Sequence, residues 1–559
     1  MLKKLIWIAT CATLVAACGS DESHGGSGGS GGAGGSGGEP RGLIVETLQG
    51  SVEGLEQDGV HVFRGVPYAA PPVGELRWKP PQPAIERDGL FDATARGNAC
   101  MQNILILGAT GDEDCLVLNI ATPAEGENLP VMFWIHGGAF TLGEGAQTDG
   151  GTLGDEIARE AGVIVVTVNY RLGAFGFLSH SELSDESPEG ASGNYGLMDQ
   201  TAGLEWVRDN IAGFGGDPNN VTIFGESAGG FSVCSHLTSP MSAGLFHKAI
   251  TQSGNCVRPW LSLEGAEAQG ETFAEKIGCD TEDDVLACLR GKSQTDVLAA
   301  FPAGPNFGFT DLEGEGATWW PIYDGHFFTE QSAVRMASGE FNQVPVMLGF
   351  TRDEGQLFTW MAETDAENPT LITEDNYDDF LAKYLGGDPV LTAQAQAQYP
   401  PDAYAAPAEA LGAFTTDVVF RCPARNEAAL LSEHVTTYLY QFEYTGAQFQ
   451  LDAFMSRPEY GLGAFHSAEI QYVFGRPASI SMTEFEPGTD SDLWMAMMGY
   501  WTRFAATGDP NGGGAPSWSA WTTDGDAHLV FDETIRPGTG AAATECAFWE
   551  DKDYLSALF

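Results

Sequence analysis

Val221-Thr222-Ile223-Phe224-Gly225-Glu226-Ser227-Ala228-Gly229-Gly230 is the stretch that decides the fold, because a β-branched and aromatic run leads straight into a serine between glycines. An apolar helical pattern begins directly after it, at Phe231. A strand that turns sharply into a helix at a G-x-S-x-G sequence exposes its serine at the top of a parallel sheet. The glycines leave room for the turn, and the dipole of the helix points its positive end at the serine. The stretch therefore predicts a strand, a tight turn with Ser227 as nucleophile, and a helix.

The pentapeptide by itself carries little information in a chain with 72 glycines. Residues 25–29, 28–32 and 34–38 match the same pattern, and they lie in a glycine and serine run that cannot bury apolar surface. The prediction for Ser227 therefore depends on the strand before it and on the helix after it. The alternative is a structural serine at a glycine turn.

Strand-like runs alternate with helical patterns along most of the chain. This alternation predicts an α/β fold with a large, mainly parallel central sheet and helices on both faces. Active sites of such sheets lie at the carboxyl ends of the strands. Segments 43–47, 60–63 and 116–120 have hairpin-like spacing and are expected to extend the sheet with antiparallel strands. The predicted parallel strands are 131–135, 163–168, 221–224, 248–251, 344–348 and 437–442.

The N-terminal residues carry the features of an export signal. Two lysines precede an apolar run at residues 5–16, which is too short to span a bilayer, so residues 1–17 are predicted to be a removed signal peptide. The sequence Leu14-Val15-Ala16-Ala17-Cys18 resembles the bacterial lipobox, which implies that Cys18 is lipidated and becomes the mature N-terminus. A plain cleaved signal peptide, and hence a secreted protein, is the alternative.

Two segments are expected to remain after the signal peptide is removed. Residues 18–38 comprise the lipidated cysteine and a glycine and serine tether, and residues 39–559 comprise one large catalytic domain with a hydrophobic core. The formal net charge of −51 repels nucleic acid and anionic lipid. We therefore expect no nucleic-acid partner and membrane contact only through Cys18. The lipobox-like sequence implies a location in the bacterial envelope that faces the periplasm or the cell surface.

The cysteines fit an oxidising compartment. Of the ten, Cys11 lies in the signal peptide and Cys18 is predicted to carry lipid, and the others can form disulfides once exported. Their spacing favours two local disulfides, Cys100 with Cys115 and Cys279 with Cys288. The sequence leaves open the pairing of Cys234, Cys256, Cys422 and Cys546.

A serine nucleophile needs a base, and the base needs an acid that orients it. In hydrolases with a strand–turn–helix serine, the chain order is serine, acid, histidine. His466 lies in a glycine-bearing loop after the predicted strand 437–442, and a catalytic base needs an imidazole that can move in such a loop. The other downstream histidines are His326, His434 and His528, of which the last two fall in a helical pattern and in a short strand.

Two further loops follow predicted strands. Asp353 and Glu354 both come after strand 344–348, and either could orient His466. His136-Gly137-Gly138-Ala139-Phe140 follows strand 131–135, and its small residues let backbone N–H groups approach a developing oxyanion. A simple glycine turn is the alternative for this second loop.

Several segments between residues 40 and 510 resemble the type-B carboxylesterase and cholinesterase family, with bacterial p-nitrobenzyl-esterase-like enzymes the most similar branch. They include Phe63-Arg64-Gly65-Val66-Pro67-Tyr68-Ala69, Glu113-Asp114-Cys115-Leu116-Val117-Leu118-Asn119-Ile120, Asn169-Tyr170-Arg171, Asn194-Tyr195-Gly196-Leu197-Met198-Asp199-Gln200 and Trp134-Ile135-His136-Gly137-Gly138-Ala139-Phe140. The resemblance implies an α/β-hydrolase fold with insertions typical of the family.

The resemblance also implies roles for individual residues. It makes Glu354 the acid of a triad with Ser227 and His466, and leaves Asp353 as a loop or salt-bridge residue. Its oxyanion donors are the N–H groups of Gly138, Ala139 and Ala228. It places Glu226 and Ser253 near the triad, Trp260, Trp319 and Trp320 on the acyl side of the pocket, and Arg64, Glu113 and Arg171 in a buried ion-pair network.

The implied activity is carboxylic-ester hydrolysis through an acyl-enzyme, without a metal or an organic cofactor. Small to medium uncharged esters are the expected substrates, because the loop between Cys100 and Cys115 lacks the tryptophan with which cholinesterases bind a cation. The same triad could instead hydrolyse an amide, a carbamate or a lactone. A non-catalytic adhesion module on the same fold is the alternative from another functional class.

Overall fold

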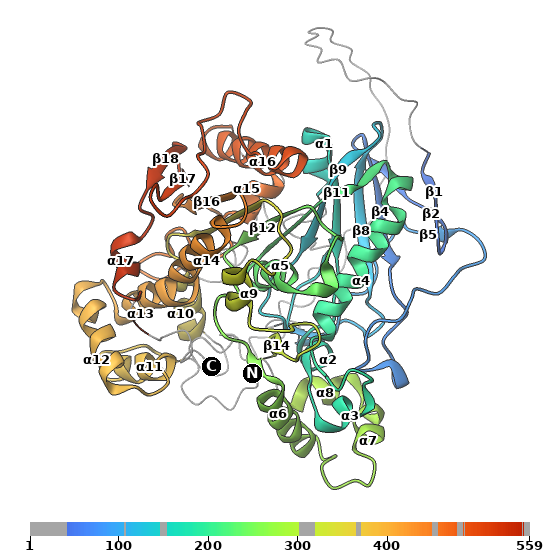
Figure 1. The fold of residues 1–559 in the computed structure, drawn as a ribbon, viewed down its shortest axis with the longest axis horizontal. Helices are drawn as coiled ribbons and strands as arrows, with labels where there is room; N and C mark the ends of the chain where they lie inside the picture. The colour runs from blue at the N-terminus through green and yellow to red at the C-terminus, as the bar shows by residue number, and fades with distance from the viewer. Residues whose placement is uncertain are drawn as a thin grey trace, which may run out of the picture. The chain divides into compact units, whose positions relative to one another are not determined.

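A central sheet of eleven strands organises the protein, and its middle is parallel from β10 to β17 (Figure 1). The computed structural model describes residues 42–104, 108–145, 154–300, 319–364, 370–449, 457–477, 485, 487–550 and 552. In spatial order the strands are β18 (Arg536–Thr539), β17 (Ala527–Phe531), β16 (Thr437–Phe442), β15 (Val346–Thr351), β12 (Lys248–Gln252), β11 (Gly216–Glu226), β9 (Leu129–Ile135), β10 (Ile164–Val168), β8 (Val117–Pro123), β4 (Val60–Pro67) and β3 (Leu55–Gln57).

Both faces of the parallel strands are buried, which explains why they were recognisable as continuous apolar runs. In β9, Val131 and Phe133 point into one core cluster, whereas Met132 and Trp134 point into another on the opposite face. This alternation is the two-residue period of a strand. All six predicted parallel strands are present, with ends that differ by a few residues.

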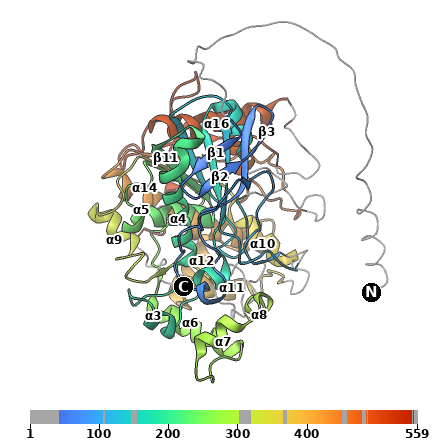
Figure 2. The same ribbon diagram turned by 90° about the vertical axis from the view of Figure 1, so that its right-hand side faces the viewer.

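Helices cover the two faces of the sheet, as Figures 1 and 2 show. One face packs against α1 (Asp155–Ala161) and α16 (Thr489–Thr507), with α15 (Ile470–Phe474) beside α16. The other face packs against α4 (Tyr195–Asn210), α5 (Ala228–Thr238) and α14 (Cys422–Ser432), with α9 (Ser332–Ser338) against α5 and α14. The remaining helices used below are α2 (Gly173–Phe177), α6 (Leu263–Lys276), α10 (Gly355–Thr364), α13 (Pro407–Thr415) and α17 (Ala543–Ala547).

One predicted strand does not join the central sheet. β1 (Ile44–Thr47) pairs with β2 (Gly50–Glu53) and belongs to a separate sheet with the order β1-β2-β5, where β5 spans Phe91–Asp92. Between β2 and β3 the chain passes Gly54, where a Cβ atom would lie 2.7 Å from the ring of Phe63. Only glycine allows this close approach, so the chain passes Phe63 at this point and continues into β3 at the edge of the central sheet. β4 and β8 do extend that sheet with antiparallel pairing, as predicted.

Four disulfides form among the described residues. The two local pairs are Cys100–Cys115 and Cys279–Cys288, as the spacing predicted. The pairs that the sequence left open are Cys234–Cys256, which joins α5 to the segment after β12, and Cys422–Cys546, which joins α14 to α17. Residues 1–41, with the predicted signal peptide, Cys18 and the tether, lie outside the described residues. None of the helices in the described segments is both long and apolar enough to cross a membrane.

Candidate active site

Ser227 occupies the sharp turn between β11 and α5. Its backbone has φ 56° and ψ −123°, a conformation that a residue with a side chain adopts only when its surroundings enforce it. The enforcing contacts are short: a Cβ atom on Gly229 would lie 1.9 Å from the carbonyl oxygen of Ile135, and one on Gly225 would lie 2.5 Å from Gly229. The Ser227 N–H also donates to the carbonyl of Gln252 at 2.9 Å. The turn therefore presents the hydroxyl at the carboxyl end of β11, as predicted.

His466 and Glu354 come together from segments that are 112 residues apart. Nδ1 of His466 lies 2.6 Å from Oε2 of Glu354, and both side chains are buried. The second carboxylate oxygen of Glu354 accepts the backbone N–H of Thr351 at 2.7 Å, which fixes the carboxylate at the carboxyl end of β15. The imidazole also contacts the rings of Phe358 and Phe420, with centroids 4.9 Å away in each case. His466 is therefore held on one side by an acid and on the other by aromatic rings.

The second ring nitrogen of His466 faces the nucleophile turn. Nε2 lies 3.2 Å from Oε1 of Glu226, the residue before Ser227. No hydrogen bond joins His466 to Ser227 in the described part of the chain. Catalytic hydrogen bonds are often loose before substrate binds, and the geometry is compatible with His466 as the base.

Three buried carboxyl groups surround this imidazole, because Glu469 joins Glu226 and Glu354. Burial raises the pKa of Glu226 to about 8 and also raises that of Glu469. Burial by itself would lower the pKa of His466, but the charges of Glu226 and Glu354 outweigh it and raise the pKa. Since neighbouring buried carboxylates resist ionising together, Glu226 and Glu469 do not titrate independently of His466.

Asp353 has a different task from its neighbour Glu354. Its carboxylate accepts the backbone N–H of Ala464 at 2.8 Å and forms an ion pair with Arg352, while its own N–H donates to the carbonyl of Ala464 at 2.9 Å. These contacts tie the loop after β15 to the loop that carries His466. Asp353 thus positions the histidine loop without touching the imidazole.

The predicted oxyanion loop lies against the nucleophile turn. A Cβ atom on Gly137 would lie 3.1 Å from the Cβ of Ser227. The backbone has positive φ at Gly138 (109°), Ala139 (53°) and Phe140 (59°), so two residues with side chains hold a left-handed conformation in succession. Such strain persists only where the surroundings compensate for it, and it is typical of functional loops. The third predicted donor, Ala228, is the first residue of α5.

A family model described as "Carboxylesterase family" matches residues 41–549. The chain belongs to the carboxylesterase family. The para-nitrobenzyl esterase of Bacillus subtilis (strain 168) is 35% identical over 504 residues, which cover 88% of this chain and 95% of that protein. Acylcarnitine hydrolase of Mus musculus is 37% identical over 547 residues, covering 90% and 89%.

Solved structures of carboxylesterases give the same result. A structure titled "PNB esterase" superimposes with a TM-score of 0.75 at 33% identity, and covers 90% of this chain and 99% of that one. A "thermophylic PNB esterase" also gives 0.75, at 32% identity. The chain therefore has the α/β-hydrolase fold and is a serine carboxylic ester hydrolase.

The three tryptophans predicted on the acyl side of this carboxylesterase lie differently. The Trp320 ring is 5.5 Å from Phe140 of the oxyanion loop and 5.2 Å from Phe231, one helical turn after Ser227. Trp260 lies 6.4 Å from Phe231, whereas Trp319 packs 5.8 Å from Phe273 of α6. Two of the three therefore adjoin the nucleophile helix. Arg258, which was not predicted near this site, holds its guanidinium 4.6 Å from the centroid of the Trp320 ring.

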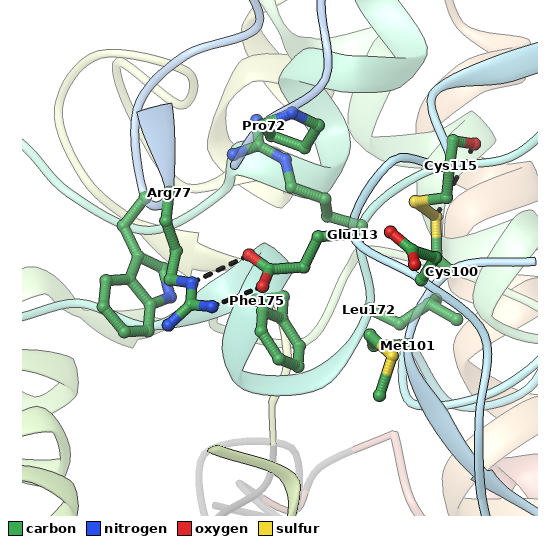
Figure 3. A pocket seen from close by; sticks show the side chains of 11 residues that line it. Pro72, Arg77, Cys100, Met101, Glu113, Cys115, Leu172 and Phe175 are labelled. Carbon is green, nitrogen blue, oxygen red and sulfur yellow. Dashed lines mark hydrogen bonds and ion pairs between the residues drawn. A yellow bond between two sulfur atoms is a disulfide. The ribbon is translucent and has the colours of Figure 1, made fainter. Parts of the chain in front are cut away.

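A small cavity of the carboxylesterase, shown in Figure 3, lies beside the Cys100–Cys115 disulfide and has room for about one water molecule. It contains no triad residue, so it is not the substrate site.

The resemblance implied that Arg64, Glu113 and Arg171 share an ion-pair network, and this was wrong. Two separate pairs form, Arg77–Glu113 and Arg171–Asp199, while Arg64 donates to Gln57. Arg64 lies on β4 near the sheet edge, whereas Arg77 reaches the buried carboxylate from the loop after it.

One residue near the triad, Glu469, was not recognised from the sequence. Glu469 follows His466 by three residues, and its Oε1 accepts from the side-chain amide of Gln252 at 3.1 Å. The spacing of one helical turn between a histidine and an acid was the available signal. Ser253, which was predicted near the triad, has φ 48° in the turn after β12, and its buried hydroxyl makes no hydrogen bond to any described residue. Among the described segments, no group of three or more potential ligands is arranged to hold a metal ion.

Proposed function

We propose that this carboxylesterase hydrolyses small to medium uncharged esters through an acyl-enzyme on Ser227. His466 takes the proton of the Ser227 hydroxyl as the oxygen attacks the ester carbonyl, and the alcohol leaves with a proton from His466. Glu354 orients the imidazole and stabilises its positive charge. The backbone N–H groups of Gly138, Ala139 and Ala228 hold the oxyanion. Water then repeats the sequence to release the acid.

The observation that carries the proposal is the hydrogen bond between His466 and Glu354 beside the strained turn of Ser227. The preference for small acyl groups rests on a second observation. Large rings of Phe140, Phe231 and Trp320 pack edge to face around the start of α5. We expect the acyl group to be short or flat, because these bulky rings adjoin the oxyanion loop and the nucleophile helix. The name of one relative, the para-nitrobenzyl esterase of Bacillus subtilis, denotes an uncharged ester and supports this preference, whereas acylcarnitine, in the name of the mouse relative, carries charge.

A panel of p-nitrophenyl esters tests this proposal. We expect kcat/KM for the acetate and butyrate to exceed that for the octanoate at least about tenfold, because each methylene that does not fit loses binding energy. A p-nitroanilide of the same acyl group should react much more slowly than the ester. A phosphonate probe should label Ser227, as located by peptide mass spectrometry, and Ser227→Ala serves as the blank. Labelling of another serine, or equal rates with all acyl lengths, would contradict the proposal.

The tryptophans offer a matched pair of variants for the same panel. Trp320→Leu should shift the preference toward longer acyl chains, because its ring adjoins Phe140 and Phe231. Trp319→Leu removes a similar ring that packs against Phe273, and the acyl preference should stay as in the wild type. A shift of equal size in both variants would show that general loosening is the cause.

For the N-terminal segment we propose a lipoprotein anchored in the bacterial envelope through Cys18. The support is the short apolar run at residues 5–16, the small residues before the cysteine and the glycine and serine tether after it. Two acyl chains on one cysteine supply the two signals that stable membrane attachment usually needs. A tether of this composition and length reaches roughly 20 Å, which would separate the enzyme from the lipid headgroups.

Intact-mass measurement of the protein from its own membranes tests the anchor. The expected product begins at Cys18 and carries acyl groups, and Cys18→Ser should move the enzyme into the soluble fraction. An unmodified N-terminus at another residue would show a plain cleaved signal peptide instead.

A further inference from the structure

The oxyanion loop, from His136 to Gly143, is a compact turn in which the last residue packs against the first two. The N–H groups of Thr141 and Leu142 both donate to the carbonyl of Gly138, at 3.0 Å in each case. At the far end, Gly143 has φ 112°, and a Cβ atom there would lie 2.4 Å from Nδ1 of His136 and 2.6 Å from the carbonyl oxygen of Gly137. Because Gly143 packs directly on the start of the loop, holding Gly143 holds the whole turn.

Gln102 makes two hydrogen bonds to the peptide of Gly143. Its side-chain amide donates to the Gly143 carbonyl at 2.9 Å, and its side-chain oxygen accepts the Gly143 N–H at 2.9 Å. The same amide donates to the carbonyl of Cys100 at 3.0 Å. Gln102 is only 3% exposed, so water cannot replace these bonds easily.

Gln102 belongs to a hairpin that is itself closed by a disulfide. β6 (Gln102–Ile104) pairs with β7 (Gly108–Thr110), and Cys100–Cys115 joins the two arms at the base. The amide of Gln102 is therefore presented from a cross-linked support, and it pairs with Gly143 as the peptide of a neighbouring strand would. The hairpin contributes no triad residue, yet it reaches the loop that carries two of the proposed oxyanion donors.

We propose that Gln102 is a positioning residue for ester hydrolysis, which keeps the strained loop from Gly138 to Phe140 in the conformation that directs its N–H groups at the oxyanion. The inference rests on the proposed function, since it takes Gly138 and Ala139 as donors. Two consecutive residues with side chains at positive φ cost free energy, and relaxation of either would turn its N–H away. The two hydrogen bonds from Gln102 to the Gly143 peptide oppose that relaxation, because they fix the last residue of the oxyanion loop to the hairpin.

The test compares Gln102→Met, which keeps the length of the side chain but removes both hydrogen bonds, with Asn511→Leu. Asn511 makes the same two-bond pairing with the peptide of Trp518, at 2.9 Å and 2.7 Å, in the loop after α16. We expect kcat of Gln102→Met to fall about tenfold to a hundredfold with KM changed less than about twofold. Affinity for a trifluoromethyl ketone, which adds to Ser227 and forms a tetrahedral oxyanion, should fall by the same factor. Asn511→Leu should lose similar thermal stability and keep both kinetic values.

The outcomes separate this inference from the proposed function. If the wild type is neither labelled at Ser227 nor inhibited by the ketone, the proposed function fails. If the wild type is inhibited and Gln102→Met is inhibited equally well, Gln102 has only a structural role and the inference is overturned. Should the methionine variant not fold, Gln102→Glu is measured in its place, because it still accepts the Gly143 N–H but cannot donate to the carbonyl. A loss of ketone affinity in that variant supports the inference, and unchanged affinity overturns it.

Discussion

Glu354→Gln is expected to lower kcat about 10⁴-fold, with the fold and KM nearly unchanged. The glutamine keeps the shape of the side chain, and its oxygen can still accept the Thr351 N–H. It loses the negative charge that stabilises an imidazolium, and its amide can favour the wrong ring tautomer of His466. Because Glu354 is fully buried against His466, solvent cannot supply a substitute. Steady-state hydrolysis of p-nitrophenyl butyrate measures the change.

Asp353→Asn is the matched control, since the two acids are adjacent in the same loop. An asparagine can still accept the N–H of Ala464 and loses only the ion pair with Arg352, which is partly exposed and therefore weak. We expect a decrease of kcat of at most about tenfold, by slight displacement of the histidine loop. Equal losses in the two variants would show that the loop as a whole, and not the Glu354 carboxylate, supports His466.

Removing the Cys422–Cys546 disulfide by a double change to alanine is expected to destabilise the protein by about 5 kcal/mol. The two cysteines are 124 residues apart, so the reduced chain gains the conformational freedom of a long loop when it unfolds. The disulfide also holds α17 against α14, and with it the chain that follows β17 and β18. Urea unfolding followed by tryptophan fluorescence gives the free energy difference.

The disulfide Cys279–Cys288 serves as the control, because it closes a loop of only 9 residues in sequence. Its removal should cost about 3 kcal/mol by the same loop-closure relation. A loss as large as that of the long loop would show that packing around the cysteines, and not chain entropy, sets the contribution.

The fold was predictable because its signals are local. Strands of a parallel sheet are buried on both faces, so runs such as Val131 to Ile135 stand out in the sequence. The turn at Ser227 was equally clear, because glycines surround it for reasons of space that the structure confirms, down to the contact of Gly229 with Ile135. The edge of the sheet was less clear. The strand at Ile44 has the right pattern but pairs with β2 in a separate small sheet, and pairing partners cannot be read from the pattern of one strand.

The spacing of residues along the sequence could not show which of two neighbouring side chains points toward a given partner. Asp353 and Glu354 have the same chemistry in the same loop, and only the tertiary structure turns one inward to His466 and the other to Ala464. Glu469 and Gln102 were missed for the same reason, since their partners are distant in sequence. Disulfide pairing also requires distances between segments, which is why Cys234, Cys256, Cys422 and Cys546 remained open.

The sequence by itself predicted the nucleophile, the order of the triad and the family, because a strand, a glycine turn and a helix follow one another locally and the family segments surround them. The residues alone left Asp353 and Glu354 open, and the resemblance implied Glu354, which the tertiary structure places against the histidine. Only the tertiary structure decided which tryptophans adjoin the nucleophile helix and how a hairpin amide pairs with the oxyanion loop. Those contacts join residues that are far apart in the sequence, 112 positions in the case of Glu354 and His466, and the direction of a side chain is fixed by packing, which no local pattern encodes.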